Sequence, residues 1–191
     1  MLQKKDKGKI LFFRESSFKV AELIFNYPNK TFHIREMAKE TGLSTTAVIG
    51  KHSLKELHEF GIIKVERTNL TTNVKANLES DAYRFYKKIF NLYRLERYTI
   101  IEKLKEVFQA EAIVLFGSFA KGEDVEESDI DILIITNHKE DEISSDFLNA
   151  WEKLLNRKIN LHILPSLQKS SKEFKNAVAN GIVLHGYFKV L

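Results

Sequence analysis

The stretch from residue 113 to residue 135, IVLFGSFAKGEDVEESDIDILII, limits the fold of this chain more than any other. Residues 113–116 and 130–135 form two apolar runs, the second interrupted only by Asp131, with the length and composition of strands buried in a sheet. Between them stand Gly117, Ser118 and Gly122, followed by an acidic segment. The sequence therefore predicts a buried strand, a tight turn, a polar loop and a second buried strand.

Two features at the facing ends of these strands indicate a site for phosphate and metal. Glycine lets backbone N–H groups approach a ligand closely, and a turn that leads into a helix can bind phosphate oxygens. Asp129 and Asp131 share one face of a strand, about 6 to 7 Å apart along the backbone. Such carboxylates repel each other unless a hard cation such as Mg²⁺ lies between them. The alternative interpretation is an ordinary turn and a strand that begins with solvated aspartates.

The pattern G-S-x-A-x-G, then a short acidic loop and S-D-x-D, resembles the signature of nucleotidyltransferases related to DNA polymerase beta, especially the minimal nucleotidyltransferases. The matching residues are Gly117, Ser118, Ala120, Gly122, Ser128, Asp129 and Asp131. The resemblance implies Mg²⁺ or Mn²⁺ as cofactor, with Asp129 and Asp131 as metal ligands. It makes a helical toxin-like protein a candidate partner. It also implies a bound nucleoside triphosphate (NTP), held by Gly117, Ser118, Gly122 and Ser128.

The same resemblance places a third carboxylate on the next strand, and the matching position here is Asn160, within KINLHIL. Asn160 is therefore the third candidate catalytic residue, beside Asp129 and Asp131. Its amide can offer an oxygen to a metal, but it brings no charge and cannot act as a base, so this departure weakens the expectation of catalysis. His162 lies on the same strand face. It either replaces the missing base or is simply packed.

The patterns around this motif predict a small α/β domain over residues 109–191, with a mixed sheet covered by helices. Residues 143–155 and 174–180 have helical patterns, and residues 158–164 have a strand pattern. Residues 79–108 contain no Gly or Pro and predict linking helices. Their aromatic and aliphatic residues are expected to pack on the domains or on a second subunit, as in a homodimer. The alternative is that the aromatic residues stack on nucleic acid.

Residues 1–78 predict a separate domain, so that the whole chain is of the α+β class. Helical patterns at 17–27, 34–40 and 44–60 are followed by strand patterns at 61–67 and 73–78, joined by TNLTT. IREMAKETGLS and LKELHEFGIIKVER resemble the winged helix-turn-helix of many archaeal and bacterial regulators. The last helix is the candidate recognition helix, and its inward face is predicted to be Ala47, Gly50, Leu54 and Leu57.

With that face inward, the candidate DNA-reading residues are Thr45, Ile49 and His52, and Val48 also points outward. The flanking cations that can meet phosphates are Lys51, Lys55, Lys64, Arg67 and Lys75. Outward Val48 and Ile49 favour an alternative in which this domain serves dimerisation or another protein contact.

The charge of the chain is unevenly divided. Residues 1–78 carry 14 Lys and Arg against 8 Asp and Glu, a net charge of +6, and residues 109–191 carry 9 against 13, a net charge of −4. This division fits duplex DNA at the first domain and metal at the second, unless the solvated surfaces merely differ. The chain has no cysteine, which excludes disulfides and thiolate metal sites. It has no apolar run long enough for a membrane span, and MLQKKDKGK lacks the apolar stretch of a signal peptide, so we expect a cytoplasmic protein.

Two functions from different classes remain at this point. In the first, the chain is an enzyme that uses Mg²⁺ to transfer a nucleoside monophosphate from an NTP to a hydroxyl group of a protein or another acceptor. In the second, it is a DNA-binding transcriptional regulator whose nucleotidyltransferase-like domain binds nucleotide or a partner without catalysis. Asn160 favours the second function, and the intact glycine turn and paired aspartates favour the first.

Overall fold

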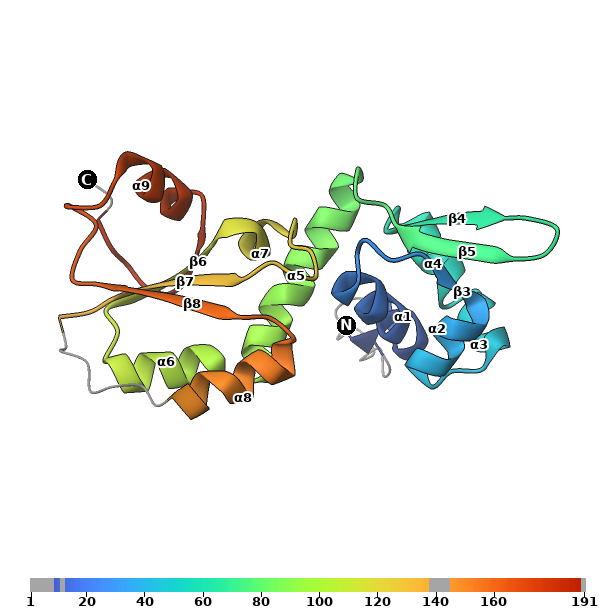
Figure 1. The fold of residues 1–191 in the computed structure, drawn as a ribbon, viewed down its shortest axis with the longest axis horizontal. Coiled ribbons are helices and arrows are strands. Elements are labelled where there is room, and N and C mark those ends of the chain that lie inside the picture. Colours follow the sequence, from blue (N-terminus) through green and yellow to red (C-terminus); the bar gives the residue numbers. More distant parts are fainter. Residues whose placement is uncertain (1–8, 11–12, 138–144, 190–191) are drawn as a thin grey trace, which may run out of the picture. The chain divides into compact units, whose positions relative to one another are not determined.

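The computed structural model describes residues 9–10, 13–137 and 145–189, and it divides the chain into two compact units, residues 1–90 and 91–191 (Figure 1). Ile143, where a helix was predicted to begin, and residues 1–8 of the predicted first domain lie outside the described residues. Within the described ranges, no helix combines the length and the apolar character needed to cross a bilayer.

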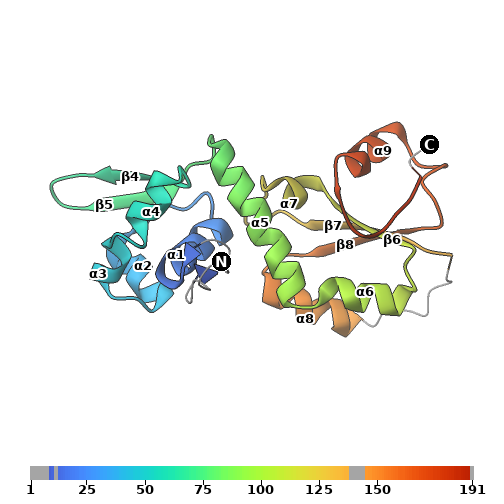
Figure 2. The ribbon, with the colours of Figure 1, turned by 180° about the vertical axis from the view of Figure 1, so that it is seen from behind.

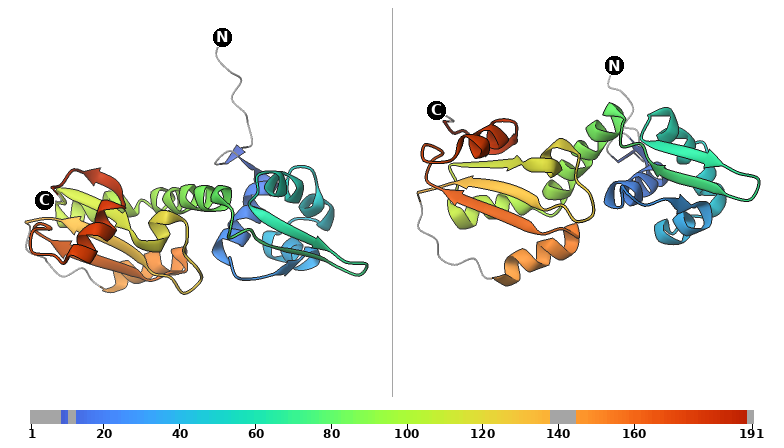
Figure 3. Two further views of the ribbon diagram at one scale, coloured as in Figure 1. Left: turned by 90° about the horizontal axis from the view of Figure 1, so that it is seen from above. Right: turned by 45° about the horizontal axis from the view of Figure 1, so that its top comes forward.

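Unit 1 (residues 1–90) is built from short helices and a three-stranded antiparallel sheet of order β3-β5-β4. A two-residue pair, β1 Lys9–Ile10 and β2 Phe13–Arg14, precedes it. The other elements are α1 Glu15–Asn26, β3 Phe32–His33, α2 Ile34–Thr41, α3 Thr45–Ile49, α4 Leu54–Glu59, β4 Ile63–Arg67 and β5 Thr72–Ala76. The β4–β5 hairpin extends beyond the helices of this unit in both views of Figure 3.

Local sequence signals explain where the helices of unit 1 begin and end. α2 starts with a capping box, in which the His33 side chain accepts from the backbone of Glu36 and the Glu36 carboxylate accepts from the backbone of His33. It ends at Gly42, whose φ of 69° is the left-handed conformation that glycine adopts without steric cost. The core is aromatic: Phe25 lies 5.5 Å from Tyr83 and 5.3 Å from Phe90, ring centre to ring centre.

The prediction of one helix over residues 44–60 is wrong, because the chain forms two short helices, α3 and α4. Gly50 has an extended backbone (φ −56°, ψ 165°) and ends α3, consistent with a helix propensity about 1 kcal/mol below that of alanine. The Ser53 N–H donates to the Gly50 carbonyl (3.1 Å) in the intervening turn. This turn frees the His52 carbonyl, which accepts from the Ser16 hydroxyl of α1 (2.6 Å).

The break also corrects the predicted faces of this region. Val48 was predicted to point outward, yet it is fully buried, whereas Ile49 is 52% exposed. Because α3 ends before α4 begins, the two helices do not share the single apolar face that a continuous helix would present. Leu54 and Leu57 are buried in α4 as predicted, while Ala47 and Gly50 are only half-buried.

Unit 2 (residues 91–191) is a four-stranded mixed sheet of order β8-β7-β6-β9, covered by helices. β6 pairs antiparallel with both β7 and β9, and β7 pairs parallel with β8. Helix α5 Asp81–Arg97 begins in unit 1, and Asn91 is the first residue of unit 2. The remaining elements are α6 Ile100–Phe108, β6 Ala112–Phe116, α7 Gly117–Lys121, β7 Ile130–Ile135, α8 Ser145–Leu155, β8 Ile159–Leu164, α9 Lys172–Ala179 and β9 Ile182–Gly186.

The two faces of this sheet pack against different helices (Figures 1 and 2). On one face, Ile113, Leu115 and Ile132 pack with residues of α6 and α8. On the other face, Val114 and Leu133 pack with Val178 of α9 and with neighbouring apolar residues. Side chains alternate along a strand, so the odd-numbered positions of β7, including Asp131, lie on the α9 side.

Candidate functional site

The two predicted carboxylates lie where β7 begins, at the end of the sheet from which α7 emerges. Asp129 immediately precedes β7, and Asp131 is its second residue. In the strand register Asp131 is paired with Phe116 of β6 on one side and with Asn160 of β8 on the other. The sheet therefore brings together the glycine turn after β6, the paired aspartates and Asn160, three segments that are separate in the sequence.

Asn160 bridges the two aspartates. Its Nδ2 donates to Asp129 Oδ2 (3.0 Å) and lies 3.4 Å from Asp131 Oδ1. The amide thus places hydrogen-bond donors between two carboxylates that would otherwise repel each other. A half-turn of the amide would present its oxygen instead, so the same residue is able to face a cation.

Gly117 sits tightly against Asp131. It has a φ of 75°, and a Cβ added to it would lie 2.4 Å from Asp131 Oδ2. Position 117 therefore requires glycine for two separate reasons, its left-handed backbone and the carboxylate beside it. This close approach holds the turn at the start of α7 directly against the carboxylate pair.

The other predicted nucleotide-binding residues shape the loop that joins α7 to β7. Gly122 is buried and ends α7 in the left-handed conformation, with a φ of 73°. The Ser118 carbonyl accepts from the Glu123 N–H (3.0 Å), and the Ser118 side chain is half-buried. The Ser128 hydroxyl accepts from the Val125 N–H (2.9 Å), so Ser128 turns the loop immediately before Asp129.

His162 is packed, which is one of the two possibilities that the sequence left open, and it also faces the carboxylate pair. Its ring packs between Phe116 and Phe174, with centre-to-centre distances of 5.2 and 5.3 Å. Its Nε2 also lies 3.7 Å from Asp131 Oδ1, and its side chain remains 38% exposed. A packed ring that still faces a carboxylate can orient that carboxylate.

The donor set fits a metal ion that is shared with a bound triphosphate. Within the described ranges, no cluster of three or more His, Cys, Asp or Glu side chains has the geometry of a metal site. Mg²⁺ in phosphoryl-transfer sites usually takes only one or two carboxylates, and the remaining ligands are substrate phosphates and water. Asp129 and Asp131 supply those two carboxylates, and both are only half-buried.

A hollow of about 470 Å³ opens beside Asp129. Its walls come from residues 126–129, from the C-terminal part of α8 and from residues 156–158 before β8. Glu126, Glu127 and Glu152 contribute acidic groups, and Lys153 and Lys158 contribute basic ones. This hollow adjoins Asp129 on the β8 side, whereas Gly117 adjoins Asp131 on the β6 side.

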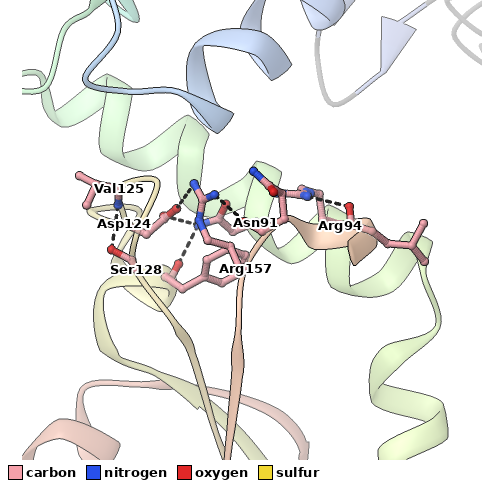
Figure 4. A network of polar contacts seen from close by, with 9 residues as sticks. Asn91, Arg94, Asp124, Val125, Ser128 and Arg157 are labelled. Atoms are coloured by element: carbon pink, nitrogen blue, oxygen red, sulfur yellow. Dashed lines mark hydrogen bonds and ion pairs between the residues drawn. The ribbon is translucent and has the colours of Figure 1, made fainter. Parts of the chain in front are cut away.

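Three polar residues that the sequence did not single out belong to a buried polar network of unit 2 (Figure 4). Asn91 of α5, Asp124 of the α7–β7 loop and Arg157 before β8 are 1%, 2% and 5% exposed. Asn91 interrupts the apolar stripe of its helix, and a polar residue in such a stripe could have predicted a buried polar contact. Asp124 was indistinguishable in the sequence from its acidic neighbours in the loop.

In unit 1, the predicted DNA-binding residues differ in exposure. Thr45, Lys51, Lys55 and Arg67 are exposed, and His52 is half-buried. Ile49, Lys55 and Arg67 line a groove of about 690 Å³, together with Leu54, His58, Val65 and other residues. The structure thus gathers part of the predicted set along one groove between the helices and the hairpin.

Glutamates pair with three of the predicted phosphate-binding lysines. Lys64 pairs with Glu79 and Lys75 pairs with Glu66, each at 2.5 Å, and Lys55 lies 4.0 Å from Glu59. The hydrogen bond from Lys75 lowers the pKa of Glu66, and the hydrogen bond from Lys64 lowers the pKa of Glu79. In the described part of the chain, Lys51 and Arg67 make no such ion pair.

The site thus combines a glycine turn, one aspartate immediately before a central strand and a second aspartate within that strand, in a mixed sheet covered by helices. Residues 98–187 match the family model for polymerase beta nucleotidyltransferases. The matched residues all lie in unit 2, the same unit that carries the glycine turn and the paired aspartates.

One curated relative narrows the comparison. The chain is similar to "Putative protein adenylyltransferase MJ1379" of Methanocaldococcus jannaschii, with 39% identity over 61 residues. The aligned segment covers 30% of this chain and 61% of the relative, which is less than two thirds of its length. No solved structure matches the chain significantly.

Proposed function

We propose that this protein transfers a nucleoside monophosphate from an NTP, with ATP as the first candidate, to a hydroxyl group of a protein. The observation that carries the proposal is the contact of Gly117 with Asp131, beside Asp129 and Asn160. It sets a turn suited to phosphate against a carboxylate pair suited to Mg²⁺ or Mn²⁺. The name of the relative, a protein adenylyltransferase, supports ATP and a protein acceptor.

In this proposal the chain's residues bind and orient the reactants. Backbone N–H groups after Gly117 hold the triphosphate, and Asp129 and Asp131 hold the cation. When bound, that cation neutralises charge on the phosphates during displacement. The acceptor oxygen forms a bond to the α-phosphorus, the bond from that phosphorus to the bridging oxygen breaks, and pyrophosphate leaves. The acceptor hydroxyl also loses its proton; Asn160 cannot take it, so the proton passes to solvent water and the transfer is expected to be slow.

Label transfer tests the proposal directly. Purified protein would be incubated with each NTP and Mg²⁺ or Mn²⁺, alone and with candidate acceptors, including a helical toxin-like protein where one is available. Label on the α-phosphate should appear on protein together with released pyrophosphate, whereas label on the γ-phosphate should not. Absence of both products with all four NTPs would contradict the proposed activity and favour nucleotide or partner binding without turnover.

A binding measurement tests the metal ligands without relying on turnover. Calorimetry should give NTP binding that depends on Mg²⁺, and Asp131→Asn should remove most of it, because one of the two carboxylate ligands is lost. Glu123→Gln is the matched control, since Glu123 is an exposed acid of the neighbouring loop. Equal NTP affinity with and without Mg²⁺ would overturn this assignment.

We further propose that unit 1 is a winged helix-turn-helix that binds duplex DNA. The order of α1, β3, α2, α3 and α4, followed by the β4–β5 hairpin, supports it. Exposed Thr45, Lys51 and Lys55 and the net charge of residues 1–78 support it as well. The groove lined by Ile49, Leu54 and Val65 favours contact with a protein, or with a second copy of the chain, as the competing function. Binding of the protein to random-sequence duplex DNA at low salt would support DNA binding, and a lack of binding would support protein contact.

A further inference from the structure

We propose that Asn91 and Asp124 are positioning residues that fix the phosphate turn of α7 relative to the paired aspartates. This inference rests on the proposed function of the same site. Neither residue faces the site; both act through the loop that carries Ser128 and Asp129.

The network is centred on the Asp124 carboxylate. Asn91 Nδ2 donates to Asp124 Oδ1 (2.7 Å) and also to the Phe119 carbonyl of α7 (2.9 Å). Arg157 Nη2 lies 3.9 Å from Asp124 Oδ2, and these two side chains are only 1% and 2% exposed. One amide therefore ties α5 to both the α7 helix and the following loop, as Figure 4 shows.

The same network reaches the strand that carries Asn160. Arg157 lies directly before β8, and the carbonyl of the next residue, Lys158, accepts from the Ile130 N–H (2.8 Å) at the start of β7. Further along the loop, the Ser128 hydroxyl accepts from the Val125 N–H. The α7 helix is thus bonded to the buried cluster directly, through the Phe119 carbonyl, whereas the aspartate strand and the Asn160 strand are connected to it along the chain, through the loop after Asp124 and through Arg157.

Charge explains why the loop needs such an anchor. Residues 123–127 contain four acids, of which Glu123 and Glu127 are exposed and Glu126 is half-buried. Like charges this close together repel one another, so confining the loop to one position carries an electrostatic cost. Asp124 instead turns inward, where Arg157 compensates its charge, because a buried carboxylate is costly unless it is paired and hydrogen-bonded.

The test compares ATP affinity, with Mg²⁺ present, among folded variants of the full chain. Asp124→Asn keeps an acceptor oxygen for Asn91 but removes the charge that faces Arg157, and Asn91→Ala removes both donated hydrogen bonds. Each should weaken ATP binding at least tenfold. Glu123→Gln makes the same charge change as Asp124→Asn, one residue away on the exposed side, and should stay within twofold of the native protein. Ile113→Val removes one methylene from the core of unit 2 and is the control for lost stability alone.

Hydrogen exchange gives a second readout that does not depend on nucleotide. In Asp124→Asn and Asn91→Ala, amides of residues 117–131 should exchange faster, while those of 100–116 should keep their native rates. Ile113→Val should not reproduce this local pattern.

Three outcomes would overturn the inference: ATP affinity within twofold of native in both folded variants, unchanged exchange over 117–131, or failure of both variants to fold. The last outcome would make the network a folding requirement of unit 2 and not a positioning device. If the native protein binds no ATP, the proposed function fails, and the exchange pattern still decides whether the network fixes the loop.

Discussion

Asn160 is the residue on which the proposed chemistry of unit 2 depends most. A carboxylate at this position would make three negative groups converge, but the amide donates to Asp129 and approaches Asp131. The native site therefore holds its two aspartates together before any cation arrives. Compared with a carboxylate at the same position, the amide would bind a metal ion more weakly and could not act as a base.

Asn160→Asp should raise transfer activity tenfold or more, which corresponds to about 1.4 kcal/mol of barrier for each tenfold. The same substitution should lower the melting temperature in the presence of a chelator, since three carboxylates then repel one another, and Mn²⁺ or Mg²⁺ should restore it. Calorimetry of metal binding and a thermal melt measure these effects. Unchanged activity in a folded variant that binds metal more tightly would show that the base is supplied elsewhere, with His162 the first residue to substitute.

The β4–β5 hairpin would contribute less to the DNA binding proposed for unit 1 than its sequence suggests. Lys64 and Lys75 already hold Glu79 and Glu66, so neither lysine is available to a phosphate without first breaking an ion pair. Such exposed pairs are weak, and a phosphate can replace the glutamate. The hairpin is thus a poorer phosphate ligand than its count of lysines suggests.

Glu66→Gln and Glu79→Gln should each strengthen binding to random duplex, because each frees one lysine. The plot of log affinity against log salt should steepen by about 0.9 for each additional phosphate that a freed lysine neutralises. Glu15→Gln is the matched control, since it breaks the Lys19 pair of α1 with the same change in charge. Fluorescence anisotropy with labelled duplex at several salt concentrations measures the slope. An equal increase in affinity in all three variants would assign the effect to net charge and not to the hairpin.

Acid should remove part of the stability of unit 1. The pKa values of Glu66 and Glu79 are lowered in the folded chain by hydrogen bonds from Lys75 and Lys64. A lowered pKa stabilises the fold above the unfolded value, about 4.3 for glutamate, and this contribution is lost as the pH falls through the folded value. The double variant Glu66→Gln, Glu79→Gln should therefore show a shallower fall of melting temperature in acid. High salt should reduce the difference, since both pairs are exposed.

For the whole molecule, a ligand of unit 2 should stabilise that unit by mass action. With Mg²⁺ present and ATP at about 100 times its dissociation constant, binding should raise the free energy of any local unfolding that abolishes the site by about 2.7 kcal/mol. Exchange of amides in β6, β7 and β8 should slow accordingly, while amides of α2, α4 and the hairpin should be unaffected. Exchange mass spectrometry with and without ATP checks this, with Asp131→Asn as the control. Equal slowing in unit 1 would mean that the two units open together.

The parts of the fold that depend on short-range patterns could be predicted from the sequence. Buried strands flanking a glycine turn, the shared face of Asp129 and Asp131, and the helix and hairpin order of residues 15–76 all follow from spacing and propensity. Spacing and propensity involve residues only a few positions apart. The predicted elements agree with the structure where one such local preference is stronger than the competing ones. The helix predicted over residues 44–60 failed because Gly50 and a turn bonded to α1 outweighed the apolar spacing.

Which polar groups lie together depends on the tertiary fold and could not be predicted from short-range patterns. Asn160 meets Asp129 because β8 pairs parallel with β7, and Asn91 meets Asp124 across 33 positions of sequence. Likewise, Val48 is buried and Lys64 is paired with Glu79, although nothing near them in the chain distinguishes them from exposed or unpaired residues. A local pattern predicts the type of element and the face on which a side chain lies. The charges around that side chain come from residues that are distant in the sequence and that the fold brings close.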